Sequence, residues 1–144
     1  MRGSWLAWLP LVGTMVVACG DSNSGPTVPA DTVAPQVAAL FPVAFARDVS
    51  RDVTIMVTFT EPINPATVGV ASFLVRRGFD TIPGTYAFGE STASFTPADR
   101  LLVQTAYSVA LSRGIRDPAG NQLARDTAWS FQTVPVVPPA PPRR

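Results

Sequence analysis

Apolar and polar side chains alternate residue by residue along most of the segment from Pro35 to Thr133, and turn-forming residues interrupt this alternation about every 8–12 residues. Successive side chains of an extended strand point to opposite faces, so a period of two places one kind of residue on each face. In VTIMVTFT, from Val53 to Thr60, the valines, the isoleucine and the phenylalanine share one face. Short strands at this spacing predict an all-β sandwich with about seven antiparallel strands.

Other stretches with the same alternation predict the remaining strands. The stretches TYAF and ASFTP are separated by the turn residues GEST, which predicts a hairpin that pairs Tyr86 and Phe88 with Phe95. One helical turn is expected at NPATV, because Asn64 suits an N-cap and Pro65 suits the first helical position. Further strands are expected at residues 72–76, 106–112 and 128–133.

The amino terminus has the pattern of a secretory signal peptide. Arg2 precedes an almost wholly apolar run of 14 residues from Trp5 to Ala18, which is shorter than the ~20 residues that span a bilayer. The last residues of this run and the only cysteine, Val16-Val17-Ala18-Cys19, resemble the lipobox of bacterial lipoproteins. The resemblance implies cleavage before Cys19, a thioether-linked diacylglycerol on Cys19, and an acyl chain such as palmitate on its amine. An ordinary secreted protein with an incidental cysteine is the alternative.

These features predict four segments. Residues 1–18 are the expected signal peptide, and residues 19–34 are the expected flexible linker, because they are rich in Ser, Asn, Gly, Pro and Asp. Residues 35–133 form the expected domain, and residues 134–144 form a proline-rich tail of polyproline II type. We expect this tail to be solvated; the alternative is a short basic contact, through Arg143 and Arg144, with an anionic envelope polymer.

Charge and composition argue against several functions. The chain has 11 basic and 10 acidic residues, so its net charge of +1 does not favour a nucleic-acid partner. All the basic residues are arginine, and the chain has neither histidine nor lysine. It thus lacks the commonest general base and the amine that forms Schiff bases. We expect no enzyme activity, no cofactor and no metal.

Several motifs, in order, resemble the SbsA-type bacterial Ig-like domain, the Big_5 family. They are APQVAALFPV at 34–43, VTIMVTFTEPINPATV at 53–68, GTYAF at 84–88, and SFTPADRLLVQTAYSVALSRGIRDPAGNQLARDTAWSFQT at 94–133. The resemblance implies an Ig-like β-sandwich of the kind found on bacterial surface and S-layer proteins. This chain departs from the family at Gln104, where glycine is common.

Structural roles are expected for a tyrosine with its leucine partner, a tryptophan and three residues of one turn. Leu101 with Tyr107 resembles the tyrosine corner of Ig-like sandwiches, in which the tyrosine hydroxyl bonds to backbone a few residues upstream. Trp129 is the expected centre of the core, because burying a tryptophan removes a large area from water. The stretch DPAGN predicts a turn in which Asp117 caps backbone N–H groups and Gly120 and Asn121 tolerate positive φ.

Two functions are compatible with these features. The first is a lipid-anchored module of the cell envelope that binds or scaffolds a protein or polysaccharide, on the outer membrane if the host has two membranes, facing the periplasm or the exterior. The second is a purely structural spacer without a ligand. An exposed aromatic cluster, such as Phe45 with Phe79, would favour binding, whereas a uniformly polar surface would favour the spacer.

Calcium is the one metal that the acidic residues make worth considering. The carboxylates that could converge at one end of a sandwich are Asp48, Asp52, Glu61 and Asp117. Calcium takes clustered oxygen ligands, but the chain has no EF-hand spacing, and solvated loops explain these residues more simply.

Overall fold

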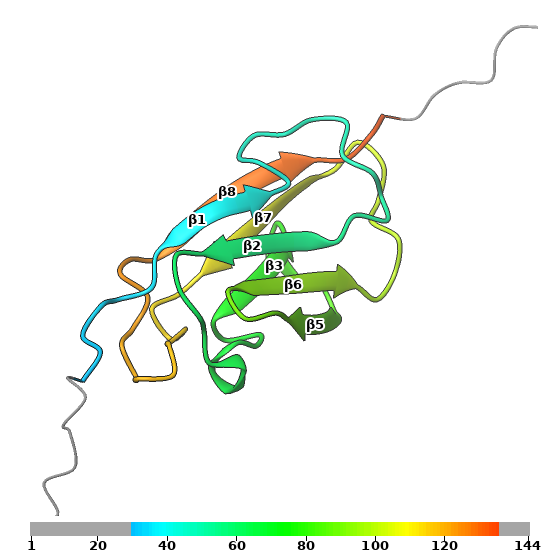
Figure 1. Ribbon diagram of the computed structural model, residues 1–144. Coiled ribbons are helices and arrows are strands. Elements are labelled where there is room, and N and C mark those ends of the chain that lie inside the picture. Colours follow the sequence, from blue (N-terminus) through cyan, green and yellow to red (C-terminus); the bar gives the residue numbers. More distant parts are fainter. Residues whose placement is uncertain (1–29, 136–144) are drawn as a thin grey trace, which may run out of the picture.

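The computed structural model describes residues 30–135, and they form two four-stranded antiparallel sheets packed face to face (Figure 1). This confirms the expected all-β sandwich. Residues 30–135 contain eight strands, of which the two-residue strand at 80–81 was not expected. The strands are β1 (Val37–Phe41), β2 (Ile55–Phe59), β3 (Phe73–Arg77), β4 (Asp80–Thr81), β5 (Gly84–Phe88), β6 (Thr92–Pro97), β7 (Ala106–Leu111) and β8 (Thr127–Gln132).

The strand order is β1-β2-β6-β5 in one sheet and β4-β3-β7-β8 in the other. The predicted hairpin is β5–β6, in which Tyr86 lies opposite Phe95 and Phe88 lies opposite Ala93. The predicted helical turn is a 3-10 turn, Pro65–Thr67, and the Asn64 side chain accepts a hydrogen bond from the Ala66 N–H. This is the capping geometry that Asn followed by Pro favours.

The core lies between the sheets and follows the period-two pattern. Alternate residues of β2, β3, β7 and β8 are buried, and their neighbours in sequence are exposed or partly exposed. Three aromatic rings from three strands pack together: Phe73 and Phe95 in the core, and the partly buried Tyr86 against it, with ring centroids 5.2–6.1 Å apart. Trp129 is a buried member of the core, and its indole N–H donates to the carbonyl of Pro42 at 3.0 Å.

The segment after β1 crosses from one sheet to the other. Its backbone bonds to β8 through Phe45 N–H to Ser130 O at 2.7 Å and through Gln132 N–H to Ala46 O at 2.8 Å. Further on, Val49 N–H donates to Gln132 O at 3.1 Å. An exposed strand edge is a template for unwanted pairing, and this segment covers the outer edge of β8.

The two ends of the described chain leave from opposite ends of the sandwich (Figure 1). We call these the N-terminal pole, near residues 30–36 and 112–126, and the C-terminal pole, near residues 42–53 and 98–105. The expected signal peptide, most of the expected linker and residues 136–144 of the expected tail lie outside the described residues. The single helical element in residues 30–135 is the 3-10 turn, and it lacks the length and apolar character to cross a bilayer.

Candidate functional site

The residues expected to shape the domain lie at both poles. At the C-terminal pole, Tyr107 is buried and its hydroxyl accepts a hydrogen bond from the N–H of Leu102 at 2.9 Å, next to the buried Leu101. The preceding turn contains Gln104 with φ of 48°. This left-handed conformation costs a residue with a Cβ more than it costs glycine, which explains why glycine is common there in the resembling family.

The DPAGN turn lies at the N-terminal pole. Asp117 is only 2% exposed, and its carboxylate accepts hydrogen bonds from the backbone N–H of Asn121 at 2.8 Å and from the Asn121 side chain at 2.7 Å. Gly120 has φ of 97°. Burial opposes ionisation of Asp117, but the bonds from Asn121 and from nearby backbone N–H groups outweigh this effect and lower its pKa.

Two further carboxylates gather around Asp117. Carboxylate oxygens of Asp31, Glu61 and Asp117 all lie within 4.8 Å of one another. Oε1 of Glu61 is buried and has no hydrogen-bond partner among the described residues. Burial raises the pKa of Glu61, and repulsion from Asp31 and Asp117 raises it further. The carboxylate oxygens of the cluster are of the kind that calcium binds.

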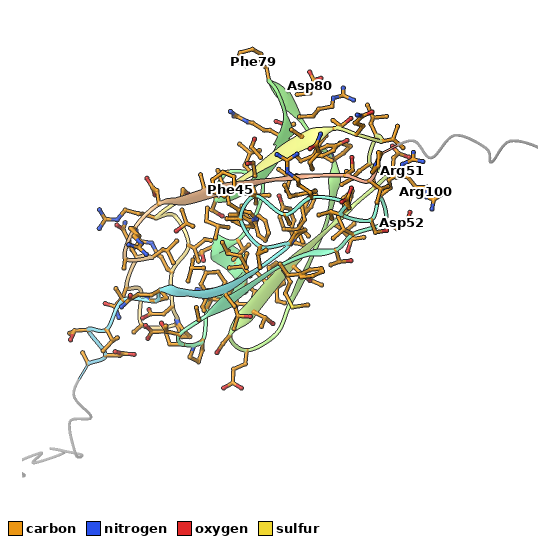
Figure 2. The ribbon with its side chains drawn as sticks, turned by 90° about the horizontal axis from the view of Figure 1, so that it is seen from above. Phe45, Arg51, Asp52, Phe79, Asp80 and Arg100 are labelled. Atoms are coloured by element: carbon orange, nitrogen blue, oxygen red, sulfur yellow. The ribbon has the colours of Figure 1, made fainter. Side chains whose placement is uncertain are left out.

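The four carboxylates considered for calcium do not converge. Glu61 and Asp117 meet at the N-terminal pole, where the third member is Asp31. Asp52 instead accepts a bidentate pair of hydrogen bonds from Arg100, with 2.7 Å between Arg100 Nε and Asp52 Oδ1. This contact is at the C-terminal pole (Figure 2). From the sequence, Asp31 was expected in the flexible linker. It lies 86 positions before Asp117, and no local pattern indicates that the two residues meet.

Arg51, Asp52 and Arg100 lie close together at the C-terminal pole (Figure 2). The Arg100 guanidinium holds the pKa of Asp52 below its ordinary value, chiefly through the side-chain hydrogen bond. Arg77 and Asp80 form a second ion pair at 2.9 Å beside the tip of the β3–β4 hairpin. Both pairs are solvent-exposed, so each adds little to stability.

An apolar hollow of about 600 Å³ is lined largely by the 41–50 segment, which reaches this pole. We call it the apolar hollow; its lining comprises Phe41, Pro42, Val43, Ala46, Arg47, Asp48, Val49, Ser50, Val53, Thr54 and Met56. Phe41, Val43 and Met56 are among its exposed apolar side chains. A hollow of this volume is in the range that binds small ligands or short peptide segments.

The exposed aromatic residues do not form one cluster. Phe79, at the tip of the β3–β4 hairpin, is fully exposed, and Phe45 is 81% exposed on the segment beside β8. The two side chains lie well apart (Figure 2). The surface is therefore not uniformly polar, and Phe45 and Phe79 do not form the aromatic cluster that would favour binding. The apolar hollow is a further exposed apolar feature of the described residues.

The geometry agrees with what comparison with known proteins finds. A family model described as bacterial Ig-like domain, Big_5, matches residues 31–133. Among solved structures, the S-layer protein SbsC is similar at 26% identity and a TM-score of 0.51, over 74% of this chain. The chain spans only 14% of the length of that S-layer chain. No curated protein matches this sequence significantly.

Two more solved structures share the fold alone. CopC from Methylosinus trichosporium OB3b has a TM-score of 0.58 at 12% identity, over 70% of this chain and 94% of that one. An L,D-transpeptidase from Mycobacterium smegmatis has a TM-score of 0.51 at 20% identity, over 71% of this chain and 41% of that one.

Proposed function

Because the chain belongs to the Big_5 family of bacterial Ig-like domains, we propose that it is a non-enzymatic, lipid-anchored module of the cell envelope that binds or scaffolds a protein or polysaccharide. The observation that carries the proposal is the position of the two ends at opposite poles (Figure 1). A domain with this arrangement separates the segment that precedes it from the segment that follows it by the length of the sandwich. The similarity to a segment of an S-layer protein supports an envelope location.

The anchor in this proposal is Cys19. One acyl chain holds a protein on a membrane only marginally, whereas two or more hold it stably, at ~0.8 kcal/mol for each buried CH₂ group. A diacylglycerol on the Cys19 sulfur with an acyl chain on its amine would meet this requirement. In a host with two membranes, the Gly20 that follows Cys19 carries no acidic signal for inner-membrane retention, which favours the outer membrane.

Fractionation of the native host tests the anchor. We expect the wild-type protein in the membrane fraction, and an inhibitor of lipoprotein signal peptidase should leave its precursor uncleaved. Cys19→Ala should lose lipid and move out of the membrane fraction. Unchanged membrane association of Cys19→Ala would contradict the anchor.

Binding is favoured over a pure spacer by one observation, the apolar hollow beside exposed Phe41 and Val43. A spacer without a ligand has no need of an exposed apolar surface, although its ends would also lie at opposite poles. Photo-crosslinking residues placed at Val43, at Phe79 and, as a control, at exposed Val70 distinguish the two functions in native envelopes. A discrete adduct from one position and not from Val70 supports binding, and no adduct from any position supports the spacer.

A further inference from the structure

The described chain ends beside the apolar hollow. Val134, the second-last described residue, donates its backbone N–H to the carbonyl of Val49 at 3.0 Å, and Val49 lines the hollow. Thr133 also pairs with Val49 in a parallel bridge. These contacts place Val134, and so the start of the residues that follow Pro135, next to Val49 in the lining of the hollow.

The sequence after Pro135 matches the chemistry of this hollow. Residues 136–142, VVPPAPP, contain no charged or hydrogen-bonding side chain. Proline-rich segments favour polyproline II, in which seven residues reach about 22 Å at 3.1 Å each. Such segments bind apolar grooves that present an aromatic side chain, because they lose little conformational entropy on binding and prolines need no partner for a backbone N–H. Phe41 supplies the aromatic side chain, 58% exposed.

We propose that residues 136–142 of the same chain occupy the apolar hollow and cover Phe41, Val43 and Met56. Attachment at Pro135 makes the contact intramolecular, so its effective concentration is in the millimolar range of short tethers, and even a weak contact is populated. The proposal needs no lipid at Cys19 and no envelope partner. It can therefore fail or hold independently of the anchor at Cys19, but a tail in the hollow would cover the apolar surface that favours binding over a spacer.

Met56 provides a single probe of this contact. The methionines of the chain are Met1, Met15 and Met56, so a chain of residues 20–144 labelled with methyl-¹³C methionine reports only on the hollow. Both sheets and all described core residues lie within residues 30–135, and this chain retains them. The comparison is a chain of residues 20–135, which ends where the described residues end.

We expect the Met56 methyl resonance to differ in position between the two chains. We also expect a soluble paramagnetic agent to broaden it less in the 20–144 chain, because the tail excludes the agent. A Met56 methyl resonance with the same position and the same broadening in both chains would overturn the proposal. The difference should persist on dilution; a difference that disappears on dilution would show that a second copy supplies the tail, and would overturn it as well. Unchanged amide resonances of the strands establish that both chains are folded.

Substitutions in the hollow and in the tail test whether these two parts contact each other. Val43→Asp places a charge in the hollow and should abolish the difference between the long and short chains. Val70→Asp is its matched control, because Val70 is 60% exposed, compared with 62% for Val43, and lies outside the hollow. Replacing Pro138, Pro139, Pro141 and Pro142 with serine should make the 20–144 chain behave like the 20–135 chain. Retention of the full difference in Val43→Asp or in the serine variant would contradict the assignment.

Discussion

The hydroxyl oxygen of Tyr107 lies 2.9 Å from the backbone nitrogen of Leu102 and accepts its hydrogen bond. The Tyr107 ring stacks on Phe131 of β8, with centroids 5.7 Å apart. The phenol therefore joins the turn before β7 to the sheet that contains β7. This is the geometry of a tyrosine corner, which holds a crossing loop against the sandwich.

Removing only this hydroxyl should lower stability modestly. We predict that Tyr107→Phe reduces the free energy of unfolding by about 1 kcal/mol, the net contribution of one hydrogen bond, because the ring and its packing stay in place. Urea denaturation with an unchanged m-value measures the difference. An unchanged midpoint would show that solvent satisfies the Leu102 N–H equally well.

Gly120 should be needed for its backbone conformation alone. Its φ is 97°, and a Cβ built there meets no atom within 4 Å, so Gly120→Ala is strained without any clash. We predict a loss of about 1–2 kcal/mol, the cost of holding a residue with a Cβ in a left-handed conformation. Gly69→Ala is the matched control, because Gly69 also has open space and has no positive φ. Equal unfolding midpoints for the two variants would contradict this explanation.

The carboxylate of Asp117 should stabilise the domain in a way that depends on pH. Asp117→Asn replaces the carboxylate with a neutral amide, which accepts hydrogen bonds from the Asn121 donors less strongly and places its own N–H₂ against one of them. The melting temperature should therefore fall at neutral pH. The pKa of Asp117 lies below the ordinary 3.8, and its contribution is therefore present above that pH and lost as pH falls through the lowered value. The difference in melting temperature between the wild-type protein and Asp117→Asn should therefore become smaller in acid. Asp99→Asn, which removes an exposed carboxylate, is the control.

Glu61 should show the opposite dependence. Its pKa is raised above the ordinary 4.5 by burial and by repulsion from Asp31 and Asp117, so ionisation costs stability in the folded state. This cost appears as pH rises above the unfolded value and is complete above the folded one. We predict that Glu61→Gln raises the melting temperature at neutral pH and has little effect below about pH 4.

A chelator should be present in the Glu61 measurement, so that no cation changes the charge of the cluster. Glu90→Gln, at an exposed glutamate of the β5–β6 turn, controls for the loss of one negative charge. A lower melting temperature for Glu61→Gln at neutral pH would show that the ionised carboxylate has a stabilising partner within the folded protein, and would contradict this explanation.

Local patterns were enough to predict most of the sandwich. The buried faces of β2, β7 and β8 follow the alternation, and the β5–β6 hairpin follows from turn residues between two short alternating runs. These features depend on residues close together in sequence. The capped turn at Asn64 is local in the same sense.

What the sequence did not predict depends on contacts between distant segments. Asp31 joins Glu61 and Asp117 because the N-terminal segment lies along the 117–124 loop, where Asn121 donates to the Asp31 carbonyl and Ala124 N–H donates to Pro35 O. The apolar hollow forms only when the 42–50 segment crosses toward β8. Neither arrangement has a periodicity or spacing that could reveal it in advance.

The central claim, an Ig-like domain held at the envelope by lipid on Cys19, is tested most directly by intact-mass analysis of protein purified from the native membrane. The account predicts a chain that begins at Cys19 and carries the added mass of a diacylglycerol with an acyl group on the amine. A chain that retains residues 1–18, or one whose cysteine carries no lipid, would contradict it.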